Sequence, residues 1–262
     1  MFRKLTTTPA HSTENTKTFF DNCAVAYSEQ HGHPQRLLNY RIGLIRKYAQ
    51  PCRDDVVLDL GCGTGHHLFA LAEEIVQGIG IDLSPAMIEV AQAHLRTSSL
   101  QGKITFLVDN GEEMRTIPEQ SIDLVICIGA LEHMLDKRAV LSNVYRLLKP
   151  RGRFFCLTPH GGYLWYQALA PLLRMDTKHL STDKFLKRHE LVDLLKASGF
   201  LHVQVGYWTF IPKGDMPSFL GFVLTGLDNV GKLFRANSLR GGLSVCAWKD
   251  ECDGFSLRRL RK

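Results

Sequence analysis

Residues 56–67 read VVLDLGCGTGHH, in which an apolar run and an acid precede three alternating glycines and two histidines. Glycines after a strand let the backbone approach a ligand closely, and the helix that follows presents free N–H groups. A dinucleotide site would carry the spacing G-x-G-x-x-G. Here Gly61, Gly63 and Gly65 alternate, and His66 stands in the place of the last glycine. The turn therefore favours another nucleoside cofactor over a dinucleotide.

A second acid, Asp82, lies about twenty residues beyond the glycine turn, where a carboxylate can accept hydrogen bonds from both ribose hydroxyls. The alternative role for Asp82 is to cap the helix that begins after it. Ser84 already suits that N-cap, and Pro85 suits the first helical position. We therefore expect Asp82 to bind a ribose.

Two histidines follow strand-like runs and could move a proton near neutral pH. His133 follows the run 124–129 and is the first candidate for a general base, and His160 in TPHGG is the second. The alternative for His133 is a structural role in capping the next helix. His66 and His67 are adjacent, and adjacent helical residues point apart, so we expect them to begin a helix rather than bind a metal.

The composition favours a compact cytoplasmic domain. The chain has 262 residues, 45% of them hydrophobic, and a net charge of +6 that is too mild to indicate a nucleic-acid partner. Seven cysteines form no CxxC pair, which favours free thiols in a reducing compartment. The N-terminal residues lack the apolar core of a signal peptide, and no run of apolar residues is long enough to span a membrane.

Short strand-like runs alternate with helical patterns through the middle of the chain. The runs are VVLDL (56–60), GIGID (78–82), ITFLVD (104–109), LVICIG (124–129) and RFFCL (153–157). Apolar strands that alternate with amphipathic helices predict a parallel sheet covered on both faces. Two more strands are expected at 201–210 and 243–249, after helices at about 184–198 and 216–235.

The ordered motifs VVLDLGCGTG, GIDLSPAMI, FLVDNGEEM, IDLVICIGALEHM and LLKPRGRFFCLTP resemble those of class I S-adenosylmethionine-dependent methyltransferases. The resemblance covers about residues 40–160 and implies a Rossmann-like α/β fold. That fold has a mostly parallel seven-stranded sheet with an antiparallel last strand, helices on both faces and a helical cap. HGHPQRLLNYRIGLI (31–45), LEHM (131–134) and a long insert after the fifth strand are similar to the ubiquinone-biosynthesis O-methyltransferases and their small-molecule relatives.

The resemblance implies that S-adenosylmethionine is the cofactor and gives the first motifs their roles. The methionine part of the cofactor would lie against Gly61, Cys62, Gly63 and Gly65. Asp59 would order this turn or meet the amino group, and Asp82 would hold the ribose. Leu83 and Met87 would pack on the adenine, with core packing as an equal interpretation for Met87.

The remaining cofactor contacts are implied at five positions. Asp109 and the backbone of Asn110 would bind the adenine edge, although Asp109 could serve only the turn. Ile128 would end the fourth strand beside the sulfonium. Arg41 matches an arginine that meets the cofactor carboxylate in the family, the alternative being a surface arginine. Tyr27 would close over the same end or pack within its helix.

The chain divides into four expected regions. These are a disordered tail (1–17), a helical cap (18–50), the cofactor-binding core (51–160) and a C-terminal part (161–262) with cap inserts at 161–182 and 213–238. Aromatic residues and leucines in the inserts favour a hydrophobic acceptor, although these segments could simply pack on the sheet as a lid. The stretch 216–235 could also rest on a membrane surface as an amphipathic helix.

The predicted function is transfer of a methyl group from S-adenosylmethionine to a small hydrophobic molecule, by in-line attack of an oxygen. Metal-using relatives carry an extra acid three residues before the Glu of their Glu-His pair, and Gly129 stands there, so we expect no required metal. Protein or nucleic-acid methylation remains an alternative, as does a non-catalytic module that binds the cofactor. The oligomeric state is left open.

Overall fold

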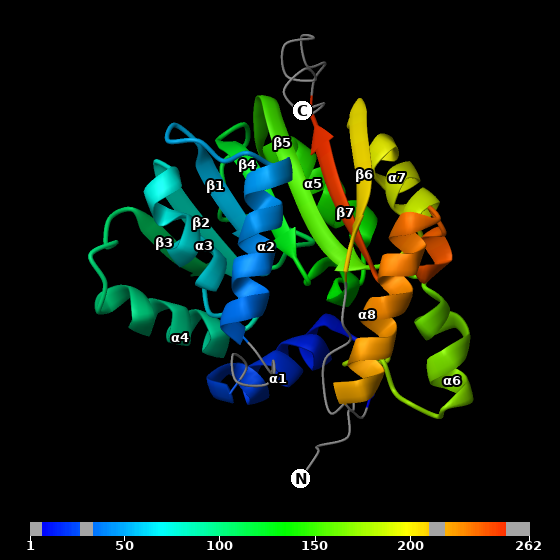
Figure 1. Ribbon diagram of the computed structural model, residues 1–262. Helices are drawn as coiled ribbons and strands as arrows, with labels where there is room; N and C mark the ends of the chain where they lie inside the picture. The colour runs from blue at the N-terminus through cyan, green and yellow to red at the C-terminus, as the bar shows by residue number, and fades with distance from the viewer. Residues whose placement is uncertain (1–6, 27–33, 210–217, 250–262) are drawn as a thin grey trace.

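The computed structural model describes residues 7–26, 34–209 and 218–249. Its centre is a seven-stranded sheet with the order β3-β2-β1-β4-β5-β7-β6, in which β7 runs antiparallel to the other six described strands (Figure 1). The strands are β1 (Val56–Leu60), β2 (Gln77–Asp82), β3 (Ile104–Val108), β4 (Ile122–Ile128), β5 (Leu148–Pro159), β6 (His202–Trp208) and β7 (Gly242–Trp248). The predicted fold class is confirmed.

Helices cover both faces of this sheet (Figure 1). One face carries α2 (Pro34–Tyr48), α3 (His66–Leu71) and α4 (Pro85–Arg96), and the other carries α5 (Lys137–Leu147) and α7 (Arg188–Ala197). The connecting turns are η1 (Ala24–Ala26), η2 (Ala72–Glu74), η3 (Leu131–His133) and η5 (Asn237–Leu239).

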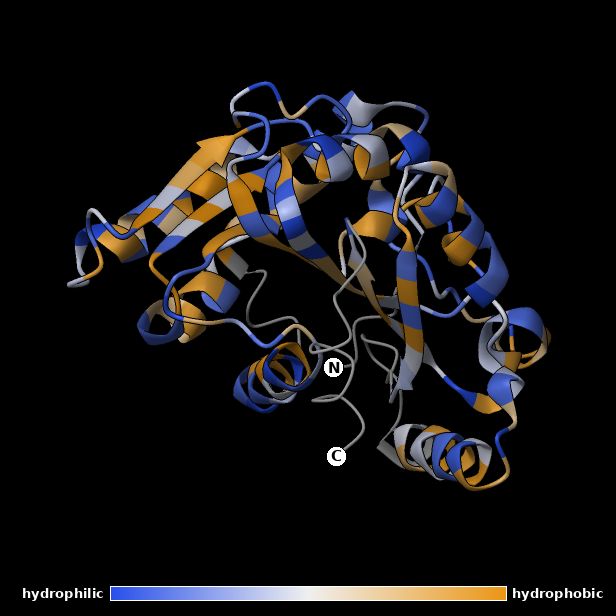
Figure 2. Ribbon diagram, turned by 90° about the horizontal axis from the view of Figure 1, so that it is seen from above, coloured by the Kyte–Doolittle hydropathy of each residue, from blue (hydrophilic) through white to orange (hydrophobic). Residues whose placement is uncertain are grey.

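Successive residues of β1 point to opposite faces and so supply two separate cores. Val57 packs in one core with Ile45 and Leu68, whereas Leu58 packs in the other with Val144. Burial on both sides explains why the strands read as continuous apolar runs. Figure 2 shows the hydrophobic residues concentrated along the strands of the sheet.

The N-terminal segment is ordered in its described part, and the expectation of a disordered tail over residues 1–17 is wrong there. Thr8 forms a β-bridge with Leu180, and helix α1 (Thr13–Cys23) begins at the Ser12 N-cap. The cause is pairing with a segment about 170 residues away, which local composition does not encode. Residues 1–6 lie outside the described part, as does Tyr27.

The junction between α5 and β5 is abrupt and irregular. Helix α5 ends at Leu147 and β5 begins directly at Leu148, so Pro150-Arg151-Gly152 lies within the strand. The pairing of β5 with β4 shifts between Ile122 and Leu124, and Arg151 has a φ of 63° within this irregular stretch.

The two inserts follow β5 and β6 in the chain and pack against each other. The first contains the π-helical turn η4 (Trp165–Leu169) and α6 (Ala170–Leu172), and the second contains α8 (Ser218–Leu233). Phe222, Leu233 and Phe234 are exposed, and membrane contact by this stretch stays a prediction. Within the described ranges, no helix combines the length and the apolar character needed to cross a membrane.

Candidate active site

The glycine turn follows β1 and requires glycine at its outer positions. Gly61, Gly63 and Gly65 have φ values of 72°, 52° and 84°, a region that side chains rarely tolerate. A Cβ at Gly65 would collide with the Phe106 ring, and one at Gly61 would collide with the Cβ of Ala130. A Cβ at Gly63 would meet only the Met87 sulfur within 4.0 Å, so this middle residue has open space beside it.

Asp82 ends β2 and joins the glycine turn to α4. Its Oδ2 accepts a hydrogen bond from the Gly63 N–H at 2.8 Å, and its Oδ1 accepts one from the Ser84 N–H at 2.9 Å. Burial raises the pKa of Asp82 to about 6, against the opposing effect of these two N–H donors. Ser84 caps α4 by accepting a bond from the Met87 N–H, so Asp82 is not needed as the side-chain cap.

A pocket lies at the carboxyl ends of β1, β2 and β4, and α1 forms part of its lining. Eleven of the predicted site residues line it: Arg41, Gly61, Cys62, Gly63, Asp82, Leu83, Met87, Asp109, Asn110, Ile128 and His133. The sequence interpretation missed the contribution of α1, which lines the pocket with Thr13, Thr16 and Phe20. It also missed that His66 and His67, which do begin α3 as expected, line the pocket as well. Their place directly after the glycine turn was the available signal.

Asp59 lies behind the glycine turn and does not line the pocket. Its side chain is fully buried, and neither carboxylate oxygen has a hydrogen-bond partner in the described part of the chain. The Nδ1 atom of His67 lies 3.5 Å from Asp59 Oδ2. A buried carboxylate without a hydrogen bond is rare enough to require an explanation.

Asp109 serves a local turn and also lines the pocket. Its Oδ1 accepts a bond from the Asn110 N–H at 2.8 Å, and its Oδ2 accepts bonds from the backbone N–H and the hydroxyl of Thr116. The turn role considered for Asp109 is therefore present. Binding of the adenine edge by Asp109 and Asn110 stays a prediction.

Arg41 reaches the pocket from α2. Its side chain is partly buried, and its Nη2 would lie 3.5 Å from a Cβ placed on Gly129 at the end of β4. Arg41 therefore stands beside the pocket wall rather than on an open surface. Met87 is buried and lines the pocket too, so core packing and adenine contact are compatible for this residue.

His133 lies in η3, after the end of β4, and faces the pocket. Its Nδ1 lies 2.7 Å from Asp183 Oδ1, and its ring packs edge-on against Phe20 with centroids 5.2 Å apart. Burial lowers the pKa of His133, but the hydrogen bond to Asp183 and the charges of Asp183 and Glu132 outweigh this effect, so the pKa is raised. The cap of α5 is Asp136, so His133 does not have the capping role considered for it.

His160 lies away from the pocket, although it was the second candidate base. Nδ1 of its ring lies 3.0 Å from the carbonyl oxygen of Arg240, and the ring packs edge-on against Tyr207. Burial lowers the pKa of this imidazole. The structure therefore gives His160 a contact between β5 and the segment before β7, and does not bring it to the other site residues.

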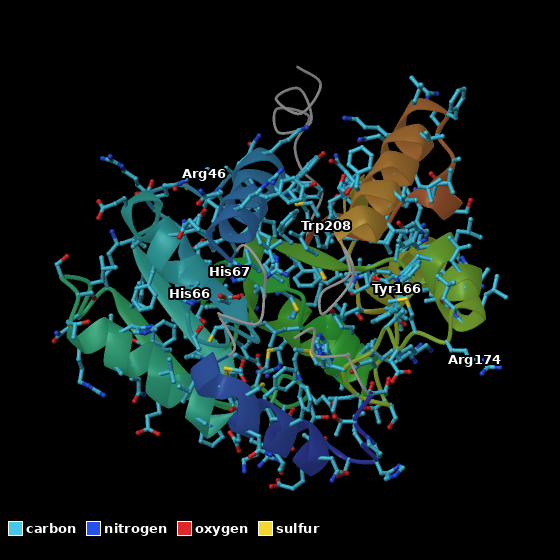
Figure 3. All side chains as sticks on the ribbon, turned by 60° about the horizontal axis from the view of Figure 1, so that its bottom comes forward. Arg46, His66, His67, Tyr166, Arg174 and Trp208 are labelled. Carbon is cyan, nitrogen blue, oxygen red and sulfur yellow. The ribbon has the colours of Figure 1, made fainter. Side chains whose placement is uncertain are left out.

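The aromatic insert does not line the pocket either. Tyr163 and Trp165 are buried in a small cluster of their own with Leu224 of α8. Figure 3 shows Tyr166 on the opposite side of the molecule from His66 and His67. The interpretation of this insert as a packed lid agrees with these contacts better than a role in lining the pocket.

Comparisons with known proteins agree with this geometry. A family model described as "Methyltransferase domain" matches residues 53–209. The chain is 30% identical over 162 residues to the ubiquinone biosynthesis O-methyltransferase of Klebsiella pneumoniae, which covers 60% of this chain and 66% of that protein. The protein of the same name from Xanthomonas oryzae is 37% identical over 102 residues, which are 39% of this chain and 42% of the relative.

A solved structure shares the fold at low sequence identity. Phosphoethanolamine N-methyltransferase 2 of Haemonchus contortus, in complex with phosphomonomethylethanolamine and S-adenosylhomocysteine, matches with a TM-score of 0.64 and 18% identity. The match covers 92% of this chain and 61% of that chain. This chain therefore spans less than two thirds of the length of each of these three proteins.

The sheet order, the glycine turn and the acid at the end of β2 define a class I methyltransferase fold. The chain belongs to the methyltransferase-domain family. The predictions of a class I S-adenosylmethionine-dependent methyltransferase, and of S-adenosylmethionine as its cofactor, are confirmed at the level of this family.

Proposed function

We propose that the pocket holds S-adenosylmethionine along the glycine turn and that the enzyme methylates a small hydrophobic molecule on oxygen. One observation carries this proposal. The Gly63 backbone and the Asp82 carboxylate form part of the wall of a pocket that is also lined by His133. A cofactor bound along the glycine turn and an acceptor molecule beside it would therefore both lie in the pocket that His133 lines, where His133 could take the acceptor's proton.

The side chains around the pocket fit the proposed cofactor. Each Asp82 oxygen accepts one backbone bond and retains a lone pair for a ribose hydroxyl. Asp59 lies behind the glycine turn beside His67, and its carboxylate would favour the cationic amino group of the methionine part through its charge rather than by lining the pocket. Arg41 lines the same pocket and suits the carboxylate of that part.

Calorimetry with S-adenosylmethionine tests the binding step. We expect the wild-type protein to bind and Gly63→Arg not to bind, since the new side chain would enter the open space beside Gly63. Gly102→Arg is the matched control, because Gly102 also has a positive φ of 86° but has nothing within 4 Å of its Cβ position and does not line the pocket. Absence of binding by the wild-type protein would refute the proposed function.

The acceptor side of the pocket supports a hydrophobic substrate. Apolar side chains of α1, α2 and the turn after β4 line it, namely Phe20, Leu37, Leu38, Met134 and Leu135. When bound, S-adenosylmethionine supplies a methyl group on a cationic sulfur. The chain's residues then have to align the acceptor, exclude water and receive a proton, the last at Nε2 of His133. The names of the two O-methyltransferase relatives support oxygen as the attacking atom.

The role of His133 as base is tested by measuring the transfer of a labelled methyl group to a panel of phenols and alcohols in variants of two histidines. We expect His133→Ala to lower turnover about a hundredfold without weakening cofactor binding, the usual size of a lost general base. His160→Ala should leave turnover unchanged, because His160 lies outside the pocket. Unchanged turnover in His133→Ala would contradict its role as base, and cofactor binding without turnover on any acceptor would favour a non-catalytic module.

A further inference from the structure

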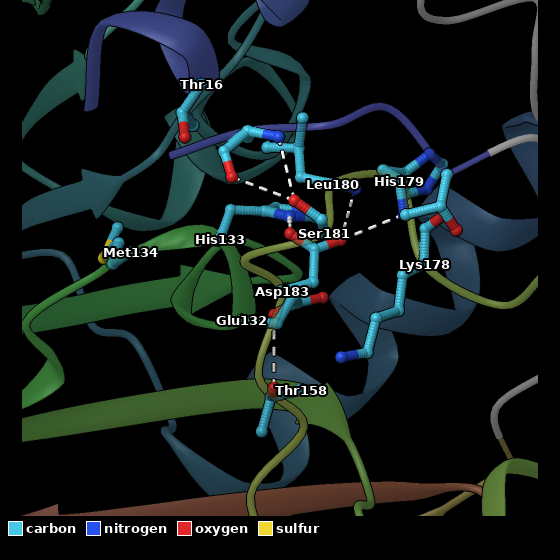
Figure 4. Close-up of polar contacts among 12 residues, drawn as sticks. Thr16, Glu132, His133, Met134, Thr158, Lys178, His179, Leu180, Ser181 and Asp183 are labelled. Atoms are coloured by element: carbon cyan, nitrogen blue, oxygen red, sulfur yellow. Dashed lines mark hydrogen bonds and ion pairs between the residues drawn. The ribbon is translucent and has the colours of Figure 1, made fainter. Parts of the chain in front are cut away.

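The proposed base is held by an acid from a segment far along the chain. Asp183 lies in the insert between β5 and α7, and its side chain is completely buried. Its Oδ1 is 2.7 Å from Nδ1 of His133 (Figure 4). The contact crosses 50 residues of sequence, and no motif of the first half of the chain predicts it.

The other oxygen of Asp183 is fixed by the backbone. Oδ2 accepts hydrogen bonds from the N–H groups of His179 and Leu180, each at 3.0 Å. A carboxylate offers acceptors and no donor when it is ionised, so both oxygens are used as acceptors. Asp183 is thus held by its own loop in the orientation in which Oδ1 meets His133.

The neighbouring groups favour the ionised form of Asp183. Burial raises the pKa of Asp183, but the hydrogen bond and charge of His133 and the Leu180 N–H outweigh it, so the pKa is lowered. His133 also faces Glu132 on its own turn, Lys137 on α5 and His179 on the insert. His179 is neutral near pH 7, because burial and the charge of His133 lower its pKa to about 4.

The turn that carries His133 is itself anchored. Lys137 donates to the carbonyl oxygens of Glu132 and Met134 at 3.3 and 2.6 Å, and the Lys184 N–H donates to the Glu132 carbonyl at 3.0 Å. The Thr158 hydroxyl donates to the Glu132 carboxylate at 3.2 Å. The imidazole therefore has a fixed position, and the remaining variable is which ring nitrogen carries the proton.

We propose that Asp183 is a positioning residue that keeps the proton of neutral His133 on Nδ1 and leaves Nε2 free to accept a proton from the substrate. This inference rests on the proposed function of His133 as general base. In the step it serves, an acceptor oxygen forms a bond to the methyl carbon while the carbon–sulfur bond breaks. The acceptor's proton passes to Nε2, and S-adenosylhomocysteine leaves as a neutral thioether. Asp183 stays ionised and stabilises the imidazolium that results.

Asp183→Asn is a sharp test, because the two backbone donors dictate how the amide must lie. The Asn oxygen has to face the N–H groups of His179 and Leu180, so its NH₂ group faces Nδ1 of His133. The ring must then accept at Nδ1 and carry its proton on Nε2. The variant keeps the shape of the site and reverses the tautomer.

Nitrogen-15 NMR of histidine-labelled protein measures the tautomer directly, with His133→Ala used to assign the signal. In the wild-type protein, above the pKa of His133, we expect a protonated Nδ1 and an unprotonated Nε2. In Asp183→Asn we expect the reverse pattern and a lowered pKa, since an ionised partner is lost. Asp176→Asn is the control, because Asp176 lies on the same insert but bonds the Thr7 N–H instead. It should leave the signals of His133 unchanged.

Kinetics give the functional readout. Asp183→Asn should lower turnover about as much as His133→Ala, roughly a hundredfold, with the cofactor dissociation constant unchanged. A proton on Nε2 of neutral His133 in the wild-type protein would overturn the inference, even if the variant did not fold. An unaltered tautomer in a folded Asp183→Asn variant would overturn it too. Failure of the proposed function is recognised separately, as absent cofactor binding in calorimetry.

Discussion

Asp82 has a structural role, and the proposed function gives the same carboxylate a binding role. Its bonds to Gly63 and Ser84 tie the glycine turn to the start of α4, and its place in the pocket wall leaves lone pairs for a ligand. Burial favours the neutral acid, so ionisation of Asp82 is harder than for an exposed aspartate. Proton binding to Asp82 and ribose binding should therefore oppose each other.

Cofactor affinity should consequently depend on pH. The pKa of Asp82 is raised from 3.8 to about 6, and under the proposed function its ionised form is the one that accepts both ribose hydroxyls. As the pH falls below about 6, the dissociation constant of S-adenosylhomocysteine should rise by up to about tenfold per pH unit. Calorimetry in small pH steps through this region measures the effect. Asp82→Asn should bind weakly with no such dependence, and a flat wild-type profile would contradict the prediction.

Several residues of the site could be predicted because each belongs to a short motif whose chemistry is local in the sequence. Gly61, Gly63 and Asp82 belong to two segments whose glycines, acid and helix cap are each explained by local chemistry. Phe20 and Asp183 could not be found in this way. An ordinary phenylalanine and a loop aspartate acquire their roles only through contacts with His133 from distant parts of the chain.

At the scale of elements, α1 is attached on both sides of the pocket. The strand-like segment before it pairs with the first insert, where the Thr8 N–H donates to the His179 carbonyl at 2.8 Å. At its other end, Asp21 accepts bonds from the Ser84 hydroxyl at 2.5 Å and the Ala86 N–H at 3.2 Å, at the start of α4. Helix α1 thereby closes the pocket between two fixed points.

Loosening the Asp21 contact should speed the loss of cofactor. Hydrogen bonds to charged groups contribute about 1.5–3 kcal/mol, so Asp21→Ala should raise the dissociation rate of S-adenosylhomocysteine on the order of tenfold. Stopped-flow displacement measures this rate. Glu14→Ala is the control on the same helix, because the exposed Glu14 side chain pairs only with Lys17 among the described residues. Equal rates in the wild-type protein and Asp21→Ala would show that α1 does not hold the pocket closed.

At the scale of the whole molecule, the sheet was predictable and the packing of the added segments was not. Alternating apolar strands and amphipathic helices leave few arrangements of a parallel sheet, and the resemblance fixed the place of the antiparallel strand. The N-terminal segment and the insert were expected to be disordered and substrate-lining, respectively. Instead residues 7–10 pair with residues 176–181, and the aromatic cluster packs with α8. Pairings of this kind join polar segments that are distant in the chain, and they leave no periodic pattern of apolar residues in the sequence from which they could be predicted.

Arg153 of β5 connects the end of α2 to the segment that leads into the sheet, and we expect it to be a main determinant of stability. Its guanidinium donates to the carbonyl oxygens of Ala49 and Gln50 at 2.5 and 2.9 Å, and to the Asp55 carboxylate at 2.6 Å. Only 16% of the Arg153 side chain and 7% of the Asp55 side chain are exposed. Removing one partner of such a pair leaves a buried charge uncompensated, which typically costs about 3–5 kcal/mol.

Arg153→Met should therefore lower the free energy of unfolding by about 3–5 kcal/mol, as measured by urea denaturation. The same strand offers a matched control in Lys149, whose ion pair with Asp123 at 2.7 Å is more exposed. Lys149→Met should cost less than about 1 kcal/mol, because solvent screens that pair. Similar losses in the two variants would mean that the buried network does not hold α2 to the sheet, and that the apolar cores alone fix the helix there.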